Sequence, residues 1–174
     1  MRYIVISDIH GAISNISKIL DKENYDKIIL LGDILYHGPR NDVPSSYNPK
    51  ELINILNNKK DIISWVKGNC DAAVDNMVLD FPMFDIIKLI INNHELSFTH
   101  GDIYNPASPL NQKDGYVIYG HTHIKDIKKI NNVTYINPGS ISIPKDDIAS
   151  YIIIDNDEIE IKDINLNIIT KIKL

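Results

Sequence analysis

The chain is predicted to be an α/β protein whose second half is mostly β, and two features of its 174 residues support this fold class. In the first half, apolar runs of strand length alternate with amphipathic segments of helical period, which is typical of parallel βαβ units. In the second half, short apolar runs follow one another, separated by Asn, Asp or Gly turns. Two packed mixed β-sheets flanked by helices, in a single domain over residues 1–174, are the simplest architecture for this pattern.

The elements expected in the first half alternate between strand and helix. In order, they are a strand over residues 2–7, a helix over 14–23, a strand over 27–31, a helix over 49–58 and a strand over 62–66. Ser14 is the expected N-cap of the first helix, and Pro49 the first residue of the second. The first two strands enclose the first helix, so they should form a parallel pair.

The second half is expected to consist of short strands. They cover residues 84–91, 96–99, 117–119, 134–136 and 151–154, and two half-exposed strands follow within 158–174. The pairs Asn92-Asn93 and Asn131-Asn132 suit hairpins or tight turns, because Asn accepts positive φ angles.

Composition limits the possible functions. The formal net charge of −5 and a pI near 5.6 disfavour binding of long nucleic acids, and an anionic substrate would need a local positive centre. The single cysteine, Cys70, excludes a disulfide framework and a thiolate zinc cluster. The start of the chain lacks a signal region, and no apolar run approaches the ~20 residues of a membrane helix. We therefore expect a soluble cytoplasmic protein that does not bind membranes and that could form a homo-oligomer through a sheet face.

Two short motifs carry potential metal ligands at positions i and i+2 directly after apolar runs. One is Asp8-Ile9-His10-Gly11 and the other is Gly120-His121-Thr122-His123. In an extended strand, side chains at i and i+2 point to the same face. Each motif is thus expected to form a bidentate claw.

Three further polar residues, Asp33, Asn69 and His100, also follow strand-like runs, each beside a glycine. In open α/β sheets, the carboxyl ends of the strands form the ligand crevice, and glycine lets the backbone turn sharply there. Imidazole, carboxylate and amide groups that converge from five strand ends predict a hydrolase with two metal ions.

The blocks D-x-H, GD, GN-x-D, H-G and G-H-x-H, in this order, resemble those of the calcineurin-like metallophosphoesterases over roughly residues 1–145. The stretches 31–41, 68–71 and 137–140 look like the small YfcE-type bacterial phosphodiesterase branch of that family. The resemblance implies a metallophosphoesterase-type sandwich of two sheets. It also implies that a hydroxide bridging two divalent ions hydrolyses a small organic phosphodiester, attacking phosphorus in line with the leaving alcohol.

The resemblance further implies how the ligands divide between the two ions. One ion would be held by Asp8, His10 and His123, the other by Asn69, His100 and His121, and Asp33 would bridge both. These ligand types suit Mn²⁺ first, with Ni²⁺, Zn²⁺ or Fe²⁺ as alternatives. With two divalent ions, two carboxylates and a hydroxide, the net charge of the site is about +1, which would attract a phosphodiester monoanion.

One position departs from the family pattern. Many members have His where this chain has Cys70, and that His helps to protonate the leaving group or to hold the phosphate. A thiol is a poorer proton donor and carries no positive charge at pH 7, so His37, in the loop after Asp33, is a possible substitute. Cys70 and His37 are therefore the candidate catalytic side chains. Arg40, in the same loop, either contacts the substrate phosphate or forms a loop salt bridge.

Other readings of the motifs stay open. A phosphomonoesterase or a nuclease would use the same ligands. The scaffold subunit of retromer also resembles this fold but has lost ligand histidines, whereas all four are present here, which favours catalysis. Asp71 either orients a ligand or forms an Asx turn, and Asn137-Pro138-Gly139-Ser140 is expected to be a turn that supports the second histidine motif.

Overall fold

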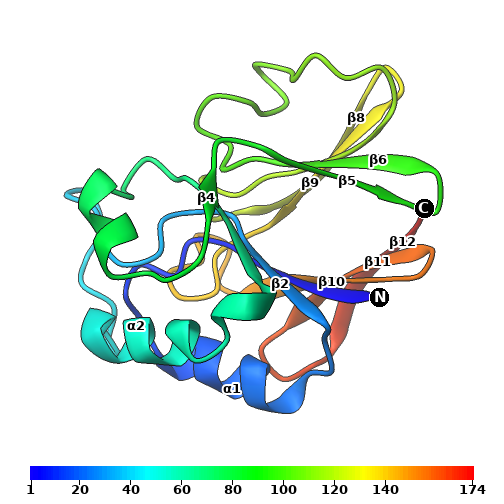
Figure 1. The fold of residues 1–174 in the computed structure, drawn as a ribbon. Coiled ribbons are helices and arrows are strands. Elements are labelled where there is room, and N and C mark those ends of the chain that lie inside the picture. Colours follow the sequence, from blue (N-terminus) through cyan, green and yellow to red (C-terminus); the bar gives the residue numbers. More distant parts are fainter.

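Two β-sheets pack face to face in the computed structural model of the protein, which describes all of residues 1–174 (Figure 1). The larger sheet has seven strands, in the spatial order β12 (Ile168–Lys173), β11 (Glu158–Asp163), β10 (Ser150–Asp155), β1 (Arg2–Ile6), β2 (Lys27–Leu30), β3 (Ile63–Val66) and β4 (Met83–Phe84). The smaller sheet has five, in the order β5 (Ile87–Ile91), β6 (His94–Phe98), β7 (Gly115–Ile118), β9 (Val133–Pro138) and β8 (Lys125–Ile130). The predicted sandwich of two mixed sheets is confirmed.

Both α-helices cover the larger sheet. α1 (Ser14–Lys22) and α2 (Pro49–Asn57) lie beneath it in Figure 1, and two 3₁₀ helices, η1 (Lys60–Ile62) and η2 (Ala73–Met77), lie in connections between its strands. Each α-helix has nine residues, and none of the helices combines the length and the apolar character needed to cross a membrane.

The two α-helices begin differently. The Asn48 side chain caps α2, because it accepts a hydrogen bond from the Glu51 backbone N–H. The prediction that Ser14 caps α1 is wrong. Ile13 occupies the N-cap position, and the Ser14 hydroxyl pairs with the Ser46 hydroxyl at 2.9 Å. α1 has no side-chain cap and is therefore held in place by burial of its apolar face against the sheet.

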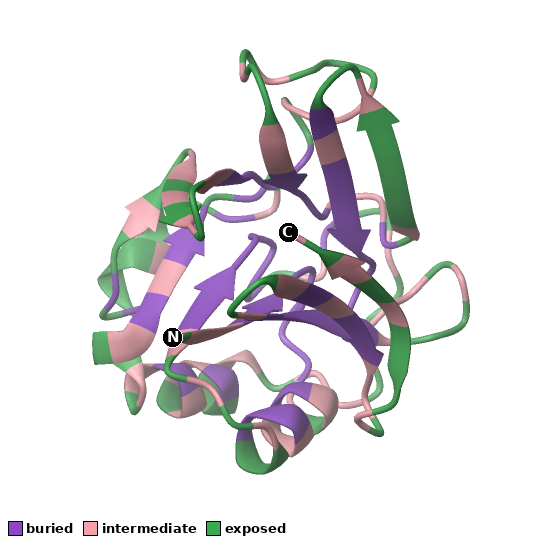
Figure 2. Ribbon diagram, turned by 90° about the vertical axis from the view of Figure 1, so that its right-hand side faces the viewer, coloured by how far each residue is buried: buried purple, intermediate pink, exposed green.

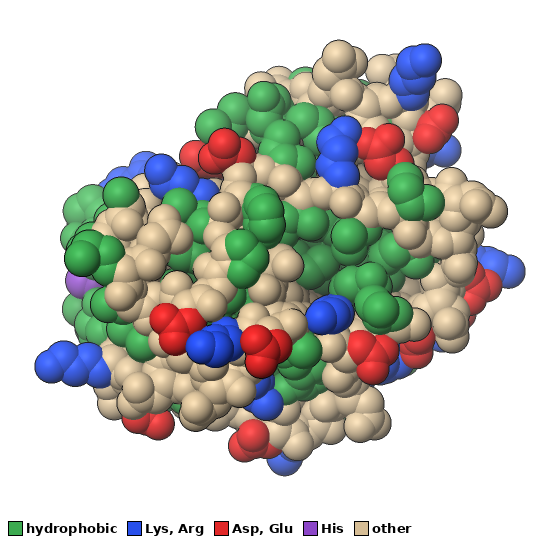
Figure 3. Space-filling view, in the orientation of Figure 1, with side chains coloured by type: hydrophobic (Ala, Val, Ile, Leu, Met, Phe, Trp, Pro, Cys, Tyr) green, Lys and Arg blue, Asp and Glu red, His purple; other side chains and the backbone are tan.

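Alternation along the strands divides the apolar side chains between two cores. Ile4 and Ile6 of β1 pack with the helices, whereas Val5 packs between the two sheets, and all three are fully buried. Figure 2 shows the buried residues along the central strands and on the inner sides of the helices. On the face shown in Figure 3, hydrophobic side chains gather in the hollow between the two sheets.

The strands that lead to the polar motifs run parallel within each sheet. β1, β2, β3 and β4 are parallel in the larger sheet, and β6, β7 and β9 in the smaller one. The parallel pairing of β1 with β2 confirms the predicted βαβ unit. Because parallel strands end at the same edge of a sheet, the loops after them are gathered at one side.

The strand prediction differs from the structure at two places. The run over 84–91 is not one strand, because Met83–Phe84 pairs with β3 and Ile87–Ile91 pairs with β6. This segment carries the chain from the larger sheet to the smaller one. The pattern also missed β8, since its Lys-rich residues lie mostly exposed at the sheet edge, where charge discourages pairing with another chain.

Both predicted Asn turns are confirmed. Asn92 and Asn93 have φ angles of 49° and 64° and join the antiparallel strands β5 and β6. Asn131, with φ 53°, lies in the turn that joins β8 to β9. These left-handed positions match the twist of a tight hairpin and are tolerated better by Asn than by most residues.

A buried charge cluster joins the end of α1 to β10 and β11. The Glu23 carboxylate accepts hydrogen bonds from the Lys162 ammonium and from the Tyr151 hydroxyl. The side chains of Glu23 and Lys162 are only 6% and 10% exposed. Burial would raise the pKa of Glu23, but the contacts with Lys162 and Tyr151 outweigh it and lower this pKa. The ionised carboxylate therefore stabilises the folded chain.

We expect Glu23→Gln to lower the free energy of unfolding by about 2 kcal/mol at pH 7, because Lys162 loses its buried counter-charge. The folded-state pKa of Glu23 lies below the ordinary value of 4.5. Its contribution is therefore complete above that pH and is lost as the pH falls through the folded-state pKa. Urea denaturation should show the difference between wild type and variant shrinking in acid.

Glu158→Gln is the matched control, because it breaks an exposed pair with Lys171 at 2.6 Å. We expect its free energy of unfolding to stay close to that of wild type. Equal losses in the two variants would contradict the importance of the buried cluster.

Candidate metal centre

Strand ends from both sheets meet and bring all seven predicted ligands together. Asp8 and His10 follow β1, Asp33 follows β2, Asn69 follows β3, His100 follows β6, and His121 and His123 follow β7. The His121 N–H donates to Asp8 Oδ2 at 2.9 Å and so ties the two sheets together at this edge. Within the smaller sheet, the Gly120 N–H donates to the His100 carbonyl at 2.7 Å.

The backbone at this edge is left-handed. The φ angle is 55° at Asp8, 49° at His10, 53° at Asp33, 67° at His121 and 60° at His123. The expectation of extended i, i+2 claws is therefore wrong for both motifs. The chain turns after each strand, and the side chains converge because of these turns. Such a conformation costs about 1 kcal/mol at a residue other than glycine, so surrounding contacts must hold it.

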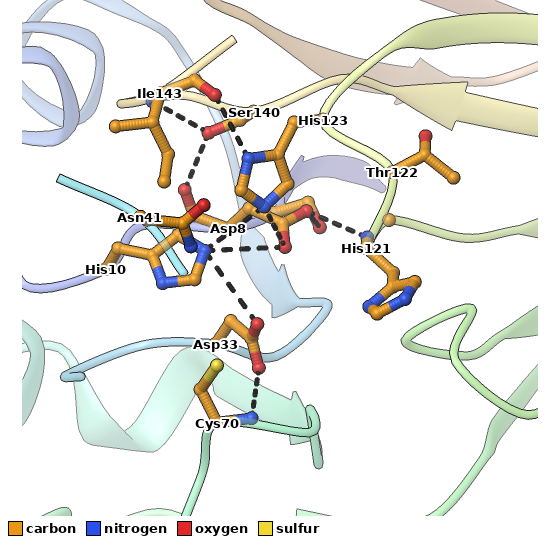
Figure 4. Close-up of polar contacts among 12 residues, drawn as sticks. Asp8, His10, Asp33, Asn41, Cys70, His121, Thr122, His123, Ser140 and Ile143 are labelled. Carbon is orange, nitrogen blue, oxygen red and sulfur yellow. Dashed lines mark hydrogen bonds and ion pairs between the residues drawn. The ribbon is translucent and has the colours of Figure 1, made fainter. Parts of the chain in front are cut away.

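Four atoms form a first donor group, namely Asp8 Oδ1, His10 Nε2, His123 Nε2 and Asp33 Oδ2 (Figure 4). His10 Nε2 lies 3.8 Å from Asp8 Oδ1, 3.7 Å from Asp33 Oδ2 and 3.2 Å from His123 Nε2. His123 Nε2 lies 3.3 Å from Asp8 Oδ1. Atoms bound at about 2.1 Å to one ion are about 3.0–3.4 Å apart, close to these separations.

Four further atoms form a second donor group, namely His100 Nε2, Asn69 Oδ1, His121 Nδ1 and Asp33 Oδ1. His100 Nε2 lies 3.0 Å from the Asn69 oxygen, 3.3 Å from the His121 nitrogen and 3.5 Å from the Asp33 oxygen. Asp33 thus directs one carboxylate oxygen to each group. His121 and His123 point to different groups, and Figure 4 shows the His121 ring turned away from His10 and His123.

Backbone carbonyl groups orient three of the imidazoles. His10 Nδ1 lies 2.8 Å from the Tyr36 oxygen, His100 Nδ1 lies 2.6 Å from the Leu31 oxygen and His123 Nδ1 lies 3.0 Å from the Ile143 oxygen. A carbonyl can only accept, so each Nδ1 carries a proton, and in the neutral form of the ring Nε2 presents a lone pair. The Nε2 lone pairs of the first donor group therefore face one another and a carboxylate, an arrangement that a cation stabilises.

Asp8 gives a second sign that a cation fits here. Its carboxylate is fully buried, yet Oδ1 has no hydrogen-bond partner, while Oδ2 accepts from the Ser7 hydroxyl at 2.6 Å and the His121 N–H at 2.9 Å. Burial would raise the pKa of Asp8, but His123, His100 and Ser7 outweigh it and lower this pKa to about 2. A buried carboxylate oxygen without a hydrogen-bond partner, beside imidazole nitrogens, fits a bound metal ion.

Asp71 holds the backbone around Asp33 from behind. Its carboxylate accepts hydrogen bonds from the backbone N–H groups of Asp33 at 2.9 Å, Ile34 at 2.8 Å and Gly68 at 2.7 Å. The Trp65 indole donates to it at 3.0 Å. Asp71 therefore orients a predicted ligand, in keeping with the first of the two interpretations of this residue.

The 137–140 segment supports the same edge from the smaller sheet. The Asn137 amide donates to the Gly120 carbonyl at 2.7 Å and to the Thr122 hydroxyl at 3.0 Å. The hydroxyls of Ser140 and Ser142 donate to the Asp8 carbonyl at 2.8 and 2.9 Å. The predicted supporting role is confirmed, but the segment is not a turn, because Asn137 and Pro138 are the last residues of β9. Its contacts hold the left-handed backbone at Asp8 as well.

Two hollows open beside the donor groups. The first hollow, of about 700 Å³, is lined by residues that include Asp33, Tyr36, Arg40, Cys70 and Lys145. The second hollow, of about 670 Å³, is lined by residues that include Lys67, Asp85, His100, Asp102 and Tyr104. Asn69 is the one residue that lines both, so the hollows meet at the second donor group.

Cys70 lies against the first donor group. Its Sγ, a ring nitrogen of His10 and a carboxylate oxygen of Asp33 all lie within 4.8 Å of one another. Burial and the charge of Asp33 raise the pKa of the thiol to about 12. The side chain is therefore a neutral thiol at pH 7.

The structure separates His37 from Arg40. The His37 ring packs edge-on against Tyr36 and Tyr47, with centroids 4.8 and 5.4 Å apart, and does not line the first hollow. Arg40 does line that hollow and has no carboxylate within 4.0 Å. The alternative of a loop salt bridge for Arg40 is therefore wrong.

Sequence reasoning missed several residues of the first hollow, notably Tyr36, Thr122 and Lys145. Thr122 lies within the second histidine motif, and Tyr36 lies four residues before Arg40, so both stood in segments already singled out. Lys145 follows the 137–140 segment but carried no pattern of its own, because a lone lysine in a loop is usually just solvated.

An arrangement of imidazole, carboxylate and amide donors at the strand ends of a two-sheet sandwich defines a metal-dependent hydrolase class. The model of the calcineurin-like phosphoesterase superfamily domain matches residues 1–158, so the chain belongs to this superfamily. The predicted family and hydrolase class are thus confirmed, and the family implies a divalent metal.

Among individual proteins, the chain is 36% identical to phosphodiesterase YfcE of Escherichia coli (strain K12) over 172 residues, covering 95% of this chain and 93% of that protein. It is 27% identical to phosphodiesterase MJ0936 of Methanocaldococcus jannaschii, covering 95% and 99%. The solved structure of the E. coli phosphoesterase Yfce superimposes with a TM-score of 0.93 at 32% identity, covering 99% of both chains. Vps29 of Entamoeba histolytica, complexed with Zn²⁺, shares the fold, with a TM-score of 0.62 at 18% identity and 99% of both chains covered.

We expect Asp71→Asn to weaken Mn²⁺ binding about 10- to 100-fold, because the amide cannot replace both carboxylate oxygens that fix the backbone of Asp33. The free energy of unfolding should fall by about 2 kcal/mol, since a buried acceptor is lost. Titration calorimetry with Mn²⁺ and urea denaturation of metal-free protein measure the two effects. Asp147→Asn, at an exposed position, is the control. Loss of stability with unchanged Mn²⁺ affinity would limit Asp71 to a role in folding.

Proposed function

We propose that the protein is a phosphodiesterase that hydrolyses a small organic phosphodiester with two divalent metal ions. The observation that carries this proposal is the Asp33 carboxylate, whose two oxygens face two separate donor groups, 3.7 Å from His10 Nε2 and 3.5 Å from His100 Nε2. The similarity to phosphodiesterase YfcE over 95% of this chain supports the reaction class.

The two donor groups would divide the ligands as the family resemblance implies. Asp8, His10 and His123 would hold one ion, Asn69, His100 and His121 the other, and Asp33 both. The mixture of imidazole, carboxylate and amide donors suits Mn²⁺, with Ni²⁺, Zn²⁺ or Fe²⁺ as alternatives. Bound there, such ions supply positive charge and Lewis acidity to the phosphoryl oxygens and lower the pKa of water.

The residues of the chain prepare the site for an anionic ester. The carbonyls of Leu31, Tyr36 and Ile143 keep the imidazoles in one tautomer, which avoids reorganisation during the reaction. Arg40 lines the first hollow and can contact an anionic group of the substrate. The hollow has the size of a small-molecule site. With the net charge of −5, this favours a small substrate over a long nucleic acid, in a protein that we place in the cytoplasm.

The alternatives differ in what they require. A phosphomonoesterase or nuclease would use the same donor groups and differ only in substrate preference. A scaffold of the Vps29 type would not need intact donor groups, and here every predicted ligand residue is present and directed into one of them. Catalysis on a small diester is therefore the function that we propose.

The decisive assay compares bis(p-nitrophenyl) phosphate with p-nitrophenyl phosphate. We expect Mn²⁺-loaded protein to hydrolyse the diester faster, chelator to abolish the activity and added Mn²⁺ to restore it. Asp33→Asn should lower kcat/KM by about 10³-fold or more, because one side chain serves both donor groups. Asp147→Asn is the control for loss of a carboxylate. Faster hydrolysis of the monoester would reassign the enzyme, and inactive protein with Mn²⁺, Ni²⁺ and Zn²⁺ would favour the scaffold.

Cys70→Ala tests the role of the thiol. We expect the variant to keep at least about a third of the wild-type kcat/KM with bound metal unchanged, because both donor groups are complete without Sγ and p-nitrophenolate needs little help to leave. Metal content by mass spectrometry should accompany the kinetics. An inactive variant with its full metal content would show that Cys70 takes part in the chemistry.

A further inference from the structure

The two hollows beside the donor groups carry opposite charge. Arg40 and Lys145 line the first hollow, where the one carboxylate is that of Asp33, a predicted metal ligand. Lys67 lines the second hollow together with Asp85, Asp102 and the hydrogen-bonded Asp71. Apart from the predicted ligands, the first hollow is thus cationic and the second is net anionic.

The two cations of the first hollow are free to bind a ligand. Neither Arg40 nor Lys145 has a carboxylate within 4.0 Å, whereas several other lysines and Arg2 form ion pairs with carboxylates. Asp146, the residue after Lys145, pairs instead with Lys125 at 2.7 Å. The positive charge of this hollow is therefore not cancelled by neighbouring carboxylates.

Both cations belong to loops that also orient histidines of the first donor group. The loop of Arg40 carries the Tyr36 carbonyl, which lies 2.8 Å from His10 Nδ1. The Lys145 N–H donates to the His123 carbonyl at 2.9 Å, and His123 Nδ1 lies 3.0 Å from the Ile143 carbonyl in the same loop. The same contacts that fix the imidazoles therefore also fix where the two cationic side chains begin.

We propose that Arg40 and Lys145 form an anion subsite, so that the preferred diester carries a second anionic group, a carboxylate or a phosphate, on one arm. The other arm, uncharged or cationic, would occupy the second hollow. This inference rests on the proposed phosphodiesterase function. An exposed ion pair contributes little alone, but two cations that line one hollow beside a metal centre should together favour an anion about tenfold over a neutral group.

Three diesters with the same p-nitrophenol leaving group test the subsite. Their second arms are 2-carboxyethyl, ethyl and 2-(trimethylammonio)ethyl. With Mn²⁺-loaded enzyme at low salt, we expect kcat/KM to be about tenfold higher for the carboxyethyl ester than for either the ethyl or the cationic ester. The ratio of carboxyethyl to ethyl should fall at high salt, because salt screens exposed charges.

The double substitution Arg40→Gln and Lys145→Gln should bring the carboxyethyl-to-ethyl ratio down to about 1. Lys128→Gln, an exposed lysine on β8 that lines neither hollow, is the control and should leave the ratio unchanged. Equal rates for the three esters, or a preference that survives the double substitution, would overturn the anion subsite. Hydrolysis of the ethyl ester would in either case still support the proposed phosphodiesterase function. Failure to hydrolyse any of the three esters would overturn both.

Discussion

Backbone carbonyl groups set the direction of the lone pairs at the candidate metal centre, and the site depends on them. Each accepts the Nδ1–H of one imidazole, so that Nε2 faces the carboxylates and, in the neutral form of the ring, offers them no proton. The carbonyls belong to the loops after β2 and β9, and the imidazoles to the loops after β1, β6 and β7. The arrangement therefore exists only when both sheets are correctly packed. Folding thus gathers imidazole nitrogens and carboxylate oxygens that a cation can bind together, which couples the fold to metal binding.

Long-range hydrogen bonds compensate for the strained backbone at these loops. The left-handed Asp8 has its carbonyl bound by two serine hydroxyls from the segment after β9, and the left-handed Asp33 has its N–H bound by Asp71. The His10 N–H donates to the Asp33 carbonyl at 2.8 Å and joins the two loops directly. Local strain is thus offset by contacts between segments far apart in sequence, as is common at functional sites. The same contacts hold the ligands in place before any ion binds.

Sequence patterns predicted most strands and the residues that meet at the candidate metal centre, because both leave local signals. Asp8, His10 and the second histidine motif stand directly after apolar runs. The extended geometry predicted for them is wrong, because the residue types at these positions do not indicate a positive φ angle. β8 was missed because an exposed edge strand needs no apolar alternation. The position of His37 against two tyrosines, and the place of Lys145 in the first hollow, depend on loop paths that tertiary contacts decide.

The central claim is that the chain builds two adjacent cation sites joined by one carboxylate. Anomalous diffraction from crystals of Mn²⁺-loaded protein tests it most directly. The account predicts two manganese peaks, with one Asp33 oxygen bound to each ion. His10, His100 and His123 should bind through Nε2, and His121 through Nδ1. A single peak, or two peaks with Asp33 bound to only one of them, would contradict it.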